Sequence, residues 1–429
     1  MQKLIKNKVY DVVIVGGGTS GVACAYIAGK LGLKTLVVER QNSLGGSITN
    51  GLVIPAMKTA MLEKNSQFYN DFVKTMQYLN GQHTYIDGND GWFNPQLAKI
   101  ALDKMLSSVG CDVLFNSDVV NAKKSDDKVL GVEILTSGLS LYIVSRYFID
   151  ATGDANFSEI LKCKKLNSEN FQSLTLRFIM GGVDINSFAD FIENLDSDRN
   201  ITTVDRTGEQ IHLSTAYTWD STTNWALRPI FEQAIQDGVL KPEDSAYFQV
   251  FTIPQMHNSI AFNCPRIASS LNLNPLNPYD YSLALMIGRE QIFRLANFCK
   301  RYLKGFEKAY ISDISNMLGV RESRRIEGEI EFCAEDIFSE KYENCEEIAL
   351  ITDYPIDIHS NKQNNSTLKQ IEKPYKLPLS ALKNKEYNNF YVIGRCLSAD
   401  FSAQASLRVQ KNCFSMGEAV ARDICNKLN

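Results

Sequence analysis

The chain has 429 residues, enough for two or three domains, and 44% of them are hydrophobic, an ordinary fraction for a globular protein. Its 45 lysines and arginines nearly balance 49 acidic residues, and the formal net charge of −4 excludes a general attraction to nucleic acid or to anionic membranes. The sequence contains no run of about 18 apolar residues, so no transmembrane helix is predicted. It also has no apolar segment before residue 10, so no secretory signal is predicted and we expect a cytoplasmic location.

The N-terminal segment predicts a strand, a glycine turn, a helix and a second strand. Tyr10–Val15 is a continuous apolar run of buried-strand length, and Lys34–Val38 is the next such run. Between them, Gly16, Gly18 and Gly21 have the GxGxxG spacing. This order of elements is typical of a dinucleotide-binding βαβ unit.

Each residue of this motif has a mechanical role. Gly16 lets the chain turn sharply off the strand, Gly18 lets a pyrophosphate approach the backbone, and Gly21 lets the helix pack closely on the sheet. The unpaired N–H groups at the helix N-terminus favour the phosphates. Glu39, followed by Arg40, stands 23 residues after Gly16, where its carboxylate can accept hydrogen bonds from both ribose hydroxyls and would repel a 2′-phosphate. We therefore expect a nucleotide whose adenosine has a free ribose.

Helix and strand patterns alternate after residue 90. Asn94–Leu106 predicts a helix with Pro95 in its first turn and apolar residues spaced by three to four. Three alternating segments then predict a strand followed by a β-hairpin or meander: Val113–Phe115, Val129–Leu135 and Leu141–Asp150.

The rest of the chain combines short strand-like runs, helices and polar stretches. Leu174–Met180 is one of several short β-like runs, and Tyr281–Tyr302 has the apolar spacing of a helix. Phe390–Ile393 predicts a last strand, and the apolar stripe that follows predicts a closing helix. Two polar stretches predict surface loops, Asn194–Gln210 and Ser360–Glu372.

The cysteines and histidines give no metal signature. None of the ten cysteines lies in a C-x-x-C pair, so a zinc knuckle, a redox dithiol and a local iron–sulfur cluster all lack their usual pattern. The four histidines are scattered along the sequence: His83, His212, His257 and His359. We therefore expect no metal site.

Several segments carry a resemblance that covers nearly the whole chain. They are VVIVGGGTSGVACA at 12–25 with VVER at 37–40, LGGSITNGL at 44–52, FIDATGDA at 148–155, LGVRESRRIEGE at 318–329, YPIDIH at 354–359, and GRCLSADFSAQASLRVQKNCFSMGEAVA at 394–421. Together they resemble the FAD-dependent oxidoreductases of the large two-dinucleotide-binding-domain superfamily. Within it, the chain is similar to flavoproteins like the flavin subunit of heterodisulfide reductase, and more distantly to fumarate-reductase-type flavoproteins.

The resemblance implies an α/β fold, with an FAD-binding Rossmann-like domain (a parallel sheet with a β-meander) and an inserted α+β substrate domain. We expect a discontinuous FAD-binding domain at 1–55, 95–165 and 350–429, and a substrate or cap domain at 166–349, to which 56–94 contribute. FAD is expected to bind non-covalently, because no histidine lies near Gly45 and Gly46, where relatives attach it. The cysteine-rich motifs of heterodisulfide reductase flavin subunits are missing, so no iron–sulfur cluster is expected.

The resemblance also implies further cofactor-binding residues. Gly45 and Gly46 match the backbone near the flavin end, and Val119 matches the position that meets the adenine. Near the C-terminus, a helix N-terminus lies beside the flavin pyrimidine ring, where its positive end would stabilise the reduced flavin. The remaining positions belong to the turn that closes the adenosine side and to the C-terminal segment: Gly153, Asp154, Gly394, Arg395, Ser406 and Leu407.

Three polar residues are candidates for catalysis. Arg321 and Arg324 belong to the RESRR segment, and arginine offers a permanently charged fork suited to a carboxylate or a phosphate. The likeness to fumarate-reductase-type flavoproteins implies substrate binding and proton donation for these arginines, and a structural salt-bridge ladder with neighbouring glutamates is the alternative. His359 would shuttle protons near neutral pH or only support its neighbours through hydrogen bonds.

The function that these observations predict is an FAD-dependent oxidoreductase. We expect a two-electron oxidation or reduction of a small organic substrate, with hydride transfer at flavin N5. A second GxGxxG is missing, so the electron donor is undefined and a partner protein for electron transfer is one option. Three alternatives stay open: a flavoprotein acting on tRNA or another macromolecule, a lipid or isoprenoid reductase, and a non-enzymatic FAD-binding protein.

Overall fold

The computed structural model describes residues 9–59, 66–167, 171–218, 225–267, 271–359 and 366–429. Seven strands form the first sheet, in the order β5-β2-β1-β8-β7-β6, with β19 paired to β8. Their bounds are β1 Tyr10–Val15, β2 Thr35–Val38, β5 Asp112–Leu114, β6 Ser117–Lys124, β7 Val129–Thr136, β8 Leu139–Asp150 and β19 Phe390–Val392. The α/β prediction, with a parallel sheet and a β-meander, is confirmed.

The long strand β8 belongs to both parts of this sheet. Its first half pairs antiparallel with β7, whose other edge pairs antiparallel with β6, and these three strands form the meander. Its second half pairs parallel with β1 and β19. In this register Val15, Val38, Asp150 and Val392 end their strands side by side, so the loops that follow them meet at one edge of the sheet.

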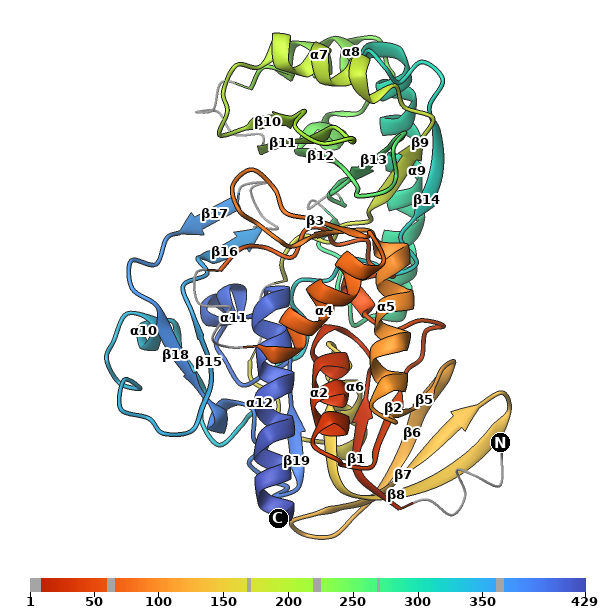
Figure 1. Cartoon of the computed structure of the whole chain (residues 1–429). Helices are drawn as coiled ribbons and strands as arrows, with labels where there is room; N and C mark the ends of the chain where they lie inside the picture. Colours follow the sequence, from red (N-terminus) through yellow and green to blue (C-terminus); the bar gives the residue numbers. More distant parts are fainter. Residues whose placement is uncertain (1–8, 60–65, 168–170, 219–224, 268–270, 360–365) are drawn as a thin grey trace.

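Helix α12 (Gln410–Leu428) packs against α2 (Thr19–Lys30), the helix that follows the glycine turn (Figure 1). The two helices approach so closely at Gly417 that a Cβ there would lie 2.2 Å from the carbonyl oxygen of Ser20. Helices α4 (Gln67–Tyr78) and α5 (Pro95–Ser108) pack against α2 in turn. The last helix is thereby held beside the first crossover of the chain.

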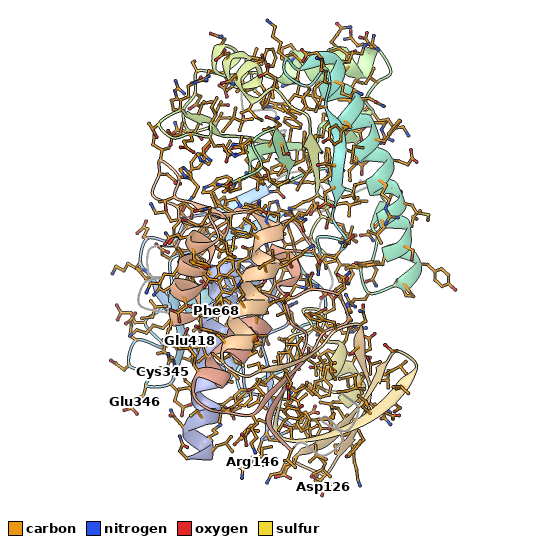
Figure 2. All side chains as sticks on the ribbon, turned by 45° about the vertical axis from the view of Figure 1, so that its right-hand side comes forward. Phe68, Asp126, Arg146, Cys345, Glu346 and Glu418 are labelled. Carbon is orange, nitrogen blue, oxygen red and sulfur yellow. The ribbon has the colours of Figure 1, made fainter. Side chains whose placement is uncertain are left out.

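A buried polar contact ties α4 to α12. The Glu418 carboxylate accepts a hydrogen bond of 3.1 Å from the Phe68 backbone amide in the first turn of α4, and it also pairs with Arg422 (Figure 2). The Phe68 ring meanwhile contacts Tyr26 of α2 and Phe414 of α12. An otherwise unpaired amide at a helix start is satisfied inside an apolar contact between three helices.

A second, antiparallel sheet lies at the other end of the molecule, at the top of Figure 1. It follows the order β10-β11-β12-β13-β9-β14, and helices α7, α8 and α9 contribute to its separate apolar core. The bounds are β9 Phe178–Gly181, α7 Ile185–Leu195, β10 Thr202–Asp205, β11 His212–Thr218, α8 Arg228–Gln236, β12 Tyr247–Thr252, β13 Ser259–Phe262, α9 Pro278–Tyr302 and β14 Tyr310–Ile314.

Short hairpins and helices connect these layers. The β3–β4 hairpin contacts the second sheet through Trp92 and Phe251, whose ring centroids lie 5.3 Å apart. The remaining strands and α-helices are β3 Gln82–His83, β4 Trp92–Phe93, α6 Asn156–Leu161, α10 Ala334–Ile337, β15 Ile348–Thr352, β16 Ile356–His359, β17 Ser366–Lys369, β18 Tyr375–Pro378 and α11 Phe401–Leu407. Among the helices of the described ranges, none combines the length and the apolar character needed to span a bilayer.

Two loop predictions are wrong in part. Residues 194–210 contain the edge strand β10, whose buried Thr202 bonds to Asp196 and to Thr215 of the neighbouring strand. Strand β17 likewise lies in the polar stretch after residue 359, of which 360–365 are outside the described residues. Polar residues form β10 because side-chain hydrogen bonds and the ladder with β11 replace an apolar face, whereas β17 pairs with β16 through its backbone ladder.

Candidate functional site

A cavity of about 1140 Å³ extends from the carboxyl edge of the first sheet to the underside of the second. Most of the residues predicted for the site line it: Gly16, Gly18, Glu39, Arg40, Gly46, Val119, Gly153, Arg321, His359, Gly394 and Arg395. The others lie outside its lining: Gly21, Gly45, Asp154, Arg324, Ser406 and Leu407.

The three glycines of the turn differ in what surrounds them. Gly16 has φ +99°, and a Cβ at Gly21 would lie 2.0 Å from the Gly16 carbonyl oxygen, so both positions are required by the protein itself. Gly18 has an ordinary extended backbone, and a Cβ there would meet nothing closer than a carbonyl oxygen 3.9 Å away. Its missing side chain leaves space only in the cavity, where a diphosphate fits against the backbone.

The N-terminus of α2 opens on the same space. Gly18 is its N-cap and provides no side-chain hydrogen bond, so the amides of the first turn have no capping partner there. Unpaired amides and the positive end of the helix dipole suit a phosphate. Both observations fit the nucleotide end that the sequence predicts.

Glu39 is buried at the end of β2 and is held by two backbone amides. Its two carboxylate oxygens accept from Gly17 at 2.6 Å and from Gln41 at 2.7 Å. Burial raises the pKa of this carboxyl above its ordinary value, against the lowering effect of the two amide bonds. Glu39 lines the cavity, and each of its oxygens can accept a further hydrogen bond, so the arrangement is compatible with a pair of ribose hydroxyls.

Two predicted residues, Gly45 and Asp154, lie outside the cavity lining and hold segments that line it. Gly45 donates its backbone N–H to the Gly17 carbonyl at 2.8 Å, which brings the 44–52 segment against the glycine turn. Asp154 forms an ion pair with Arg395, whose Nε also donates to the Gly153 carbonyl at 2.7 Å. Arg395 further donates to the Val320 carbonyl, so it joins the strand-end turn at 153 to the RESRR segment.

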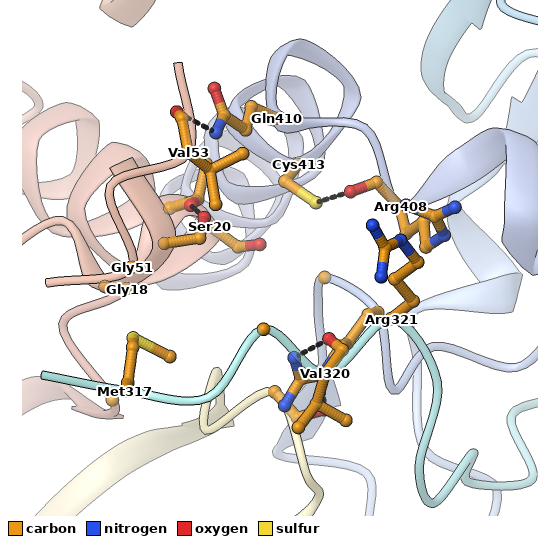
Figure 3. A pocket seen from close by; sticks show the side chains of 18 of the residues that line it. Gly18, Ser20, Gly51, Val53, Met317, Val320, Arg321, Arg408, Gln410 and Cys413 are labelled. Carbon is orange, nitrogen blue, oxygen red and sulfur yellow. Dashed lines mark hydrogen bonds between the residues drawn. The ribbon is translucent and has the colours of Figure 1, made fainter. Parts of the chain in front are cut away.

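Ser406 and Leu407 do not belong to the helix start that lines the cavity. Both end α11 and are buried, and the Ser406 hydroxyl bonds to Tyr354 and Tyr375. Helix α12 begins after them, and the residues of its start that line the cavity are Val409, Gln410 and Cys413. Figure 3 shows Gln410 and Cys413 beside Ser20. The sequence left open whether Ser406 and Leu407 precede or open the last helix, and the structure shows that they precede it.

Arginines line the end of the cavity beneath the second sheet. Arg321, which the sequence singled out, lies there with Arg177 and Arg408, which it did not. Figure 3 shows Arg321 and Arg408 together, across the cavity from Gly18 and Gly51. Arg324 points elsewhere, to Glu159 at 3.2 Å and to the Asp154 carbonyl, so its position does not support a catalytic role. Arg325 pairs with Glu322, as the salt-bridge alternative foresaw for this segment.

His359 is engaged at both ring nitrogens. Nδ1 accepts from Arg266 at 2.8 Å, so Nε2 carries the proton and donates to Asp357 at 3.1 Å. Burial and the nearby charge of Arg321 lower the pKa of His359 to about 3, against the opposing effect of Asp357. Burial acts to raise the pKa of Asp357, but His359, Arg408 and Arg321 lower it to about 2. At neutral pH this is a neutral imidazole beside a carboxylate, an arrangement that favours the supporting role over proton transfer.

One group of side chains has the donor types of a metal site. Within the described ranges, ligand atoms of Cys333, Glu335 and Asp400 lie within 4.8 Å of one another. Asp400, however, already accepts from the amides of Ala334 and Ala403 at two helix starts. The group caps helices, and nothing else at it points to an ion.

The model of a family described as FAD dependent oxidoreductase matches residues 11–424. The chain belongs to this family. It is 32% identical over 151 residues to thiamine thiazole synthase of Archaeoglobus fulgidus, and 27% identical over 173 residues to digeranylgeranylglycerophospholipid reductase of Methanococcus vannielii. These matches cover 33% and 37% of this chain but only 55% and 43% of the two relatives. The chain thus matches about half the length of these curated relatives.

One solved structure to which the chain is similar is that of a geranylgeranyl bacteriochlorophyll reductase-like protein from Thermoplasma acidophilum. It has 14% sequence identity and a TM-score of 0.47, and the match covers 98% of this chain and 79% of that one. The family assignment supplies the cofactor: FAD is the group that the glycine turn, Glu39 and the open helix start of α2 would hold.

Proposed function

We propose that this flavoenzyme oxidises or reduces a small organic molecule by two electrons, with hydride transfer at flavin N5. One observation carries the proposal: a single cavity joins the nucleotide-binding features of the first sheet to a polar end under the second sheet. That cavity is large enough for a dinucleotide and a small substrate together.

Different residues along the cavity would bind different parts of the cofactor and the substrate. Gly16, Gly18 and the start of α2 would bind the diphosphate, and Glu39 would accept from the ribose. The start of α12, at Val409, has no side-chain cap, so its amides would face the flavin pyrimidine side and favour negative charge there. FAD, when bound, supplies the N5 position that accepts or gives a hydride. The arginine-lined end would bind and orient the substrate.

Non-covalent attachment is part of the proposal. Among the described residues that line the cavity, His359 is the one histidine, and both of its ring nitrogens are already engaged. The arginine-lined end of the cavity also disfavours a lipid or isoprenoid substrate, because buried guanidinium groups would lose hydrogen bonds beside an apolar chain. A small polar substrate suits this end better.

The purified protein is expected to be yellow. Acid or heat should release the flavin, and chromatography should identify it as FAD, because non-covalent binding leaves no link to the chain. A stopped-flow screen of reductants and oxidants, scored by bleaching and return of the flavin absorbance, would then define the reaction. A colourless protein that fails to take up added FAD would contradict the proposal.

Replacing Glu39 with alanine is expected to weaken FAD binding by about 1–3 kcal/mol, since hydrogen bonds from the ribose lose their acceptor. Fluorescence titration of the apoprotein measures the affinity. Glu346→Ala removes a carboxylate from the surface and serves as the matched control, with unchanged affinity expected (Figure 2). If both variants bind FAD as the parent protein does, the ribose assignment is wrong.

A further inference from the structure

Two histidines stack face to face where the β3–β4 hairpin contacts the second sheet. His83 ends β3 and His212 begins β11, and their ring centroids lie 3.4 Å apart with an angle of 7° between the ring planes. In the hairpin His83 is paired with Trp92, whose ring contacts Phe251 of β12. His212 is buried and His83 is half-buried. This histidine pair therefore joins the hairpin to the second sheet.

The pair lies near the edge of the second sheet that is farthest from the chain connections. In the order β10-β11-β12-β13-β9-β14, the chain enters the sheet at β9 and leaves it after β14, whereas His212 lies in β11, next to the opposite edge strand. Figure 1 shows β9 and β14 on the right of this sheet and β10 and β11 on the left. A contact at the free edge restrains rotation of the sheet about its connected edge.

Both partners of the pair are attached to walls of the cavity. Strand β11 pairs with β12, whose Tyr247 and Gln249 line the cavity. On the other side, the carbonyl of Gly91, directly before β4, accepts a hydrogen bond of 2.9 Å from the amide of Ala56. Ala56 belongs to the segment 53–57, most of which lines the cavity. Separation of the two histidines would therefore move these walls apart and widen the cavity.

In the described part of the chain, the titratable groups near the histidine pair come from the hairpin and from the end of β10: Tyr85, Asp87, Asp205 and Arg206. The Tyr85 ring lies edge-on to both imidazoles, and Asp87 lies near Tyr85. Asp205 is paired with His212 in the strand register, and its carboxylate accepts from the amide and the hydroxyl of Thr207. Arg206 forms ion pairs on α7 instead. Asp205 is thus the group that can oppose a positive charge on the pair.

Burial keeps both imidazoles neutral at neutral pH. It lowers the pKa of His212 to about 4, with the adjacent His83 adding to the effect, and it also lowers the pKa of His83, while Asp205 opposes both shifts. The Nε2 atom of His83 is buried without a hydrogen-bond partner among the residues described, so its N–H in an imidazolium would lack an acceptor. Two stacked imidazoliums would also repel each other, and the single charge of Asp205 cannot neutralise both.

We infer that the histidine pair is an acid-sensitive latch between the β3–β4 hairpin and the second sheet: the neutral rings hold the two together, and protonation separates them and opens the cavity. Such a latch acts whatever substrate the cavity binds. Because the pKa of His212 in the stack is below its ordinary value of 6.5, the contact has its full strength above about pH 6.5 and weakens as the pH falls toward 4. At about pH 5 this one group favours the separated state by about 30-fold relative to neutral pH.

Trp92 reports on the latch, because it is paired with His83 in the hairpin and is only 7% exposed. The full protein with its flavin is labelled with 5-fluorotryptophan, and Trp92→Phe and Trp225→Phe assign two of the three fluorine signals. Between about pH 8 and about pH 5 we expect the Trp92 signal to shift as its ring becomes exposed, and the difference between spectra in water and in heavy water measures that exposure. Trp225, in the core of the second sheet, should keep its signal.

Variants assign the titration to the histidine pair. His212→Phe keeps a flat ring in the stack but removes its proton site, so the opening at about pH 5 is expected to fall about 30-fold relative to the parent protein. His257→Phe replaces an exposed histidine in the loop after β12 and should titrate like the parent. If His212→Phe does not fold, His83→Phe takes its place with a reduced titration expected, and the titration of the unmodified protein stands in either case.

Three results would overturn the inference. The first is a Trp92 signal that stays unchanged over this pH range. The second is the same titration in the parent and in a folded variant that lacks one histidine of the pair. The third is a Trp225 signal that changes together with that of Trp92, because this result indicates unfolding of the second sheet rather than opening of the latch.

Discussion

Gly18→Ala is expected to lower FAD affinity by about tenfold to 100-fold, because the new methyl group would occupy the space of the diphosphate and weaken charge-assisted bonds from backbone amides. The apoprotein should fold normally. Gly18 has φ −73°, which alanine accepts, and the nearest protein atom to its Cβ would be 3.9 Å away. The combination of normal stability with lost affinity is what separates a ligand site from a packing site.

Gly208→Ala provides the control for this experiment. A Cβ at Gly208 would also have its nearest protein atom at 3.9 Å, but the residue lies in a loop outside the cavity. Flavin fluorescence titration measures the affinity of both apoproteins, and thermal unfolding measures their stability. Gly208→Ala should match the parent in both. Unchanged FAD affinity in Gly18→Ala would show that the diphosphate does not approach this turn.

Gly417→Val is expected to destabilise the fold by about 3 kcal/mol, the upper part of the range for overpacked cores. A Cβ at Gly417 would lie 2.2 Å from the Ser20 carbonyl oxygen and 2.8 Å from the Cys24 amide nitrogen. Both are backbone atoms of α2 and cannot swing aside. The two helices would have to separate, which would also move the start of α12 away from Gly18. We therefore expect weaker FAD binding in the fraction that folds.

Asn426→Val is the matched control in the same helix. Asn426 is exposed in the last turns of α12, so valine meets no close neighbour and the expected change stays within about 0.5 kcal/mol. Urea denaturation gives the free energy of unfolding for both variants. If Gly417→Val were as stable as Asn426→Val, the close crossing of α2 and α12 would not be required, and the shared site between them would lose its structural basis.

The nucleotide end was accessible from the sequence because its parts are close together in the chain. The glycine turn, α2 and Glu39 lie within one crossover unit, and each element there follows from local sterics or apolar periodicity. Helix α5 was found in the same way, since Asn94 caps its start and Pro95 occupies its first position. The edge strand β10 was missed because its polar side chains pair with neighbours that are only defined after folding.

The choice between Arg321 and Arg324 shows where sequence reasoning stops. The two stand in one short motif, yet Arg321 turns into the cavity and Arg324 turns to Glu159. The segment that carries them is not helical, so residues three apart do not share a face. No local pattern distinguishes them, and the packing of this segment against the 153–154 turn decides which one is buried.

The sequence by itself determined that a nucleotide-binding crossover opens this chain, because glycine sterics, strand hydrophobicity and the spacing to Glu39 act over a few tens of residues. Only the tertiary structure decided the composition of the other end of the cavity. Arg177, Arg321 and Arg408 are far apart along the chain. They converge on one cavity because Arg177 directly precedes β9 of the second sheet, Arg321 follows β14 of that sheet, and Arg408 joins α11 to α12, which packs against α2. The interaction between their charges depends on the distances between them, and the fold sets those distances, so no single segment of the sequence predicts it.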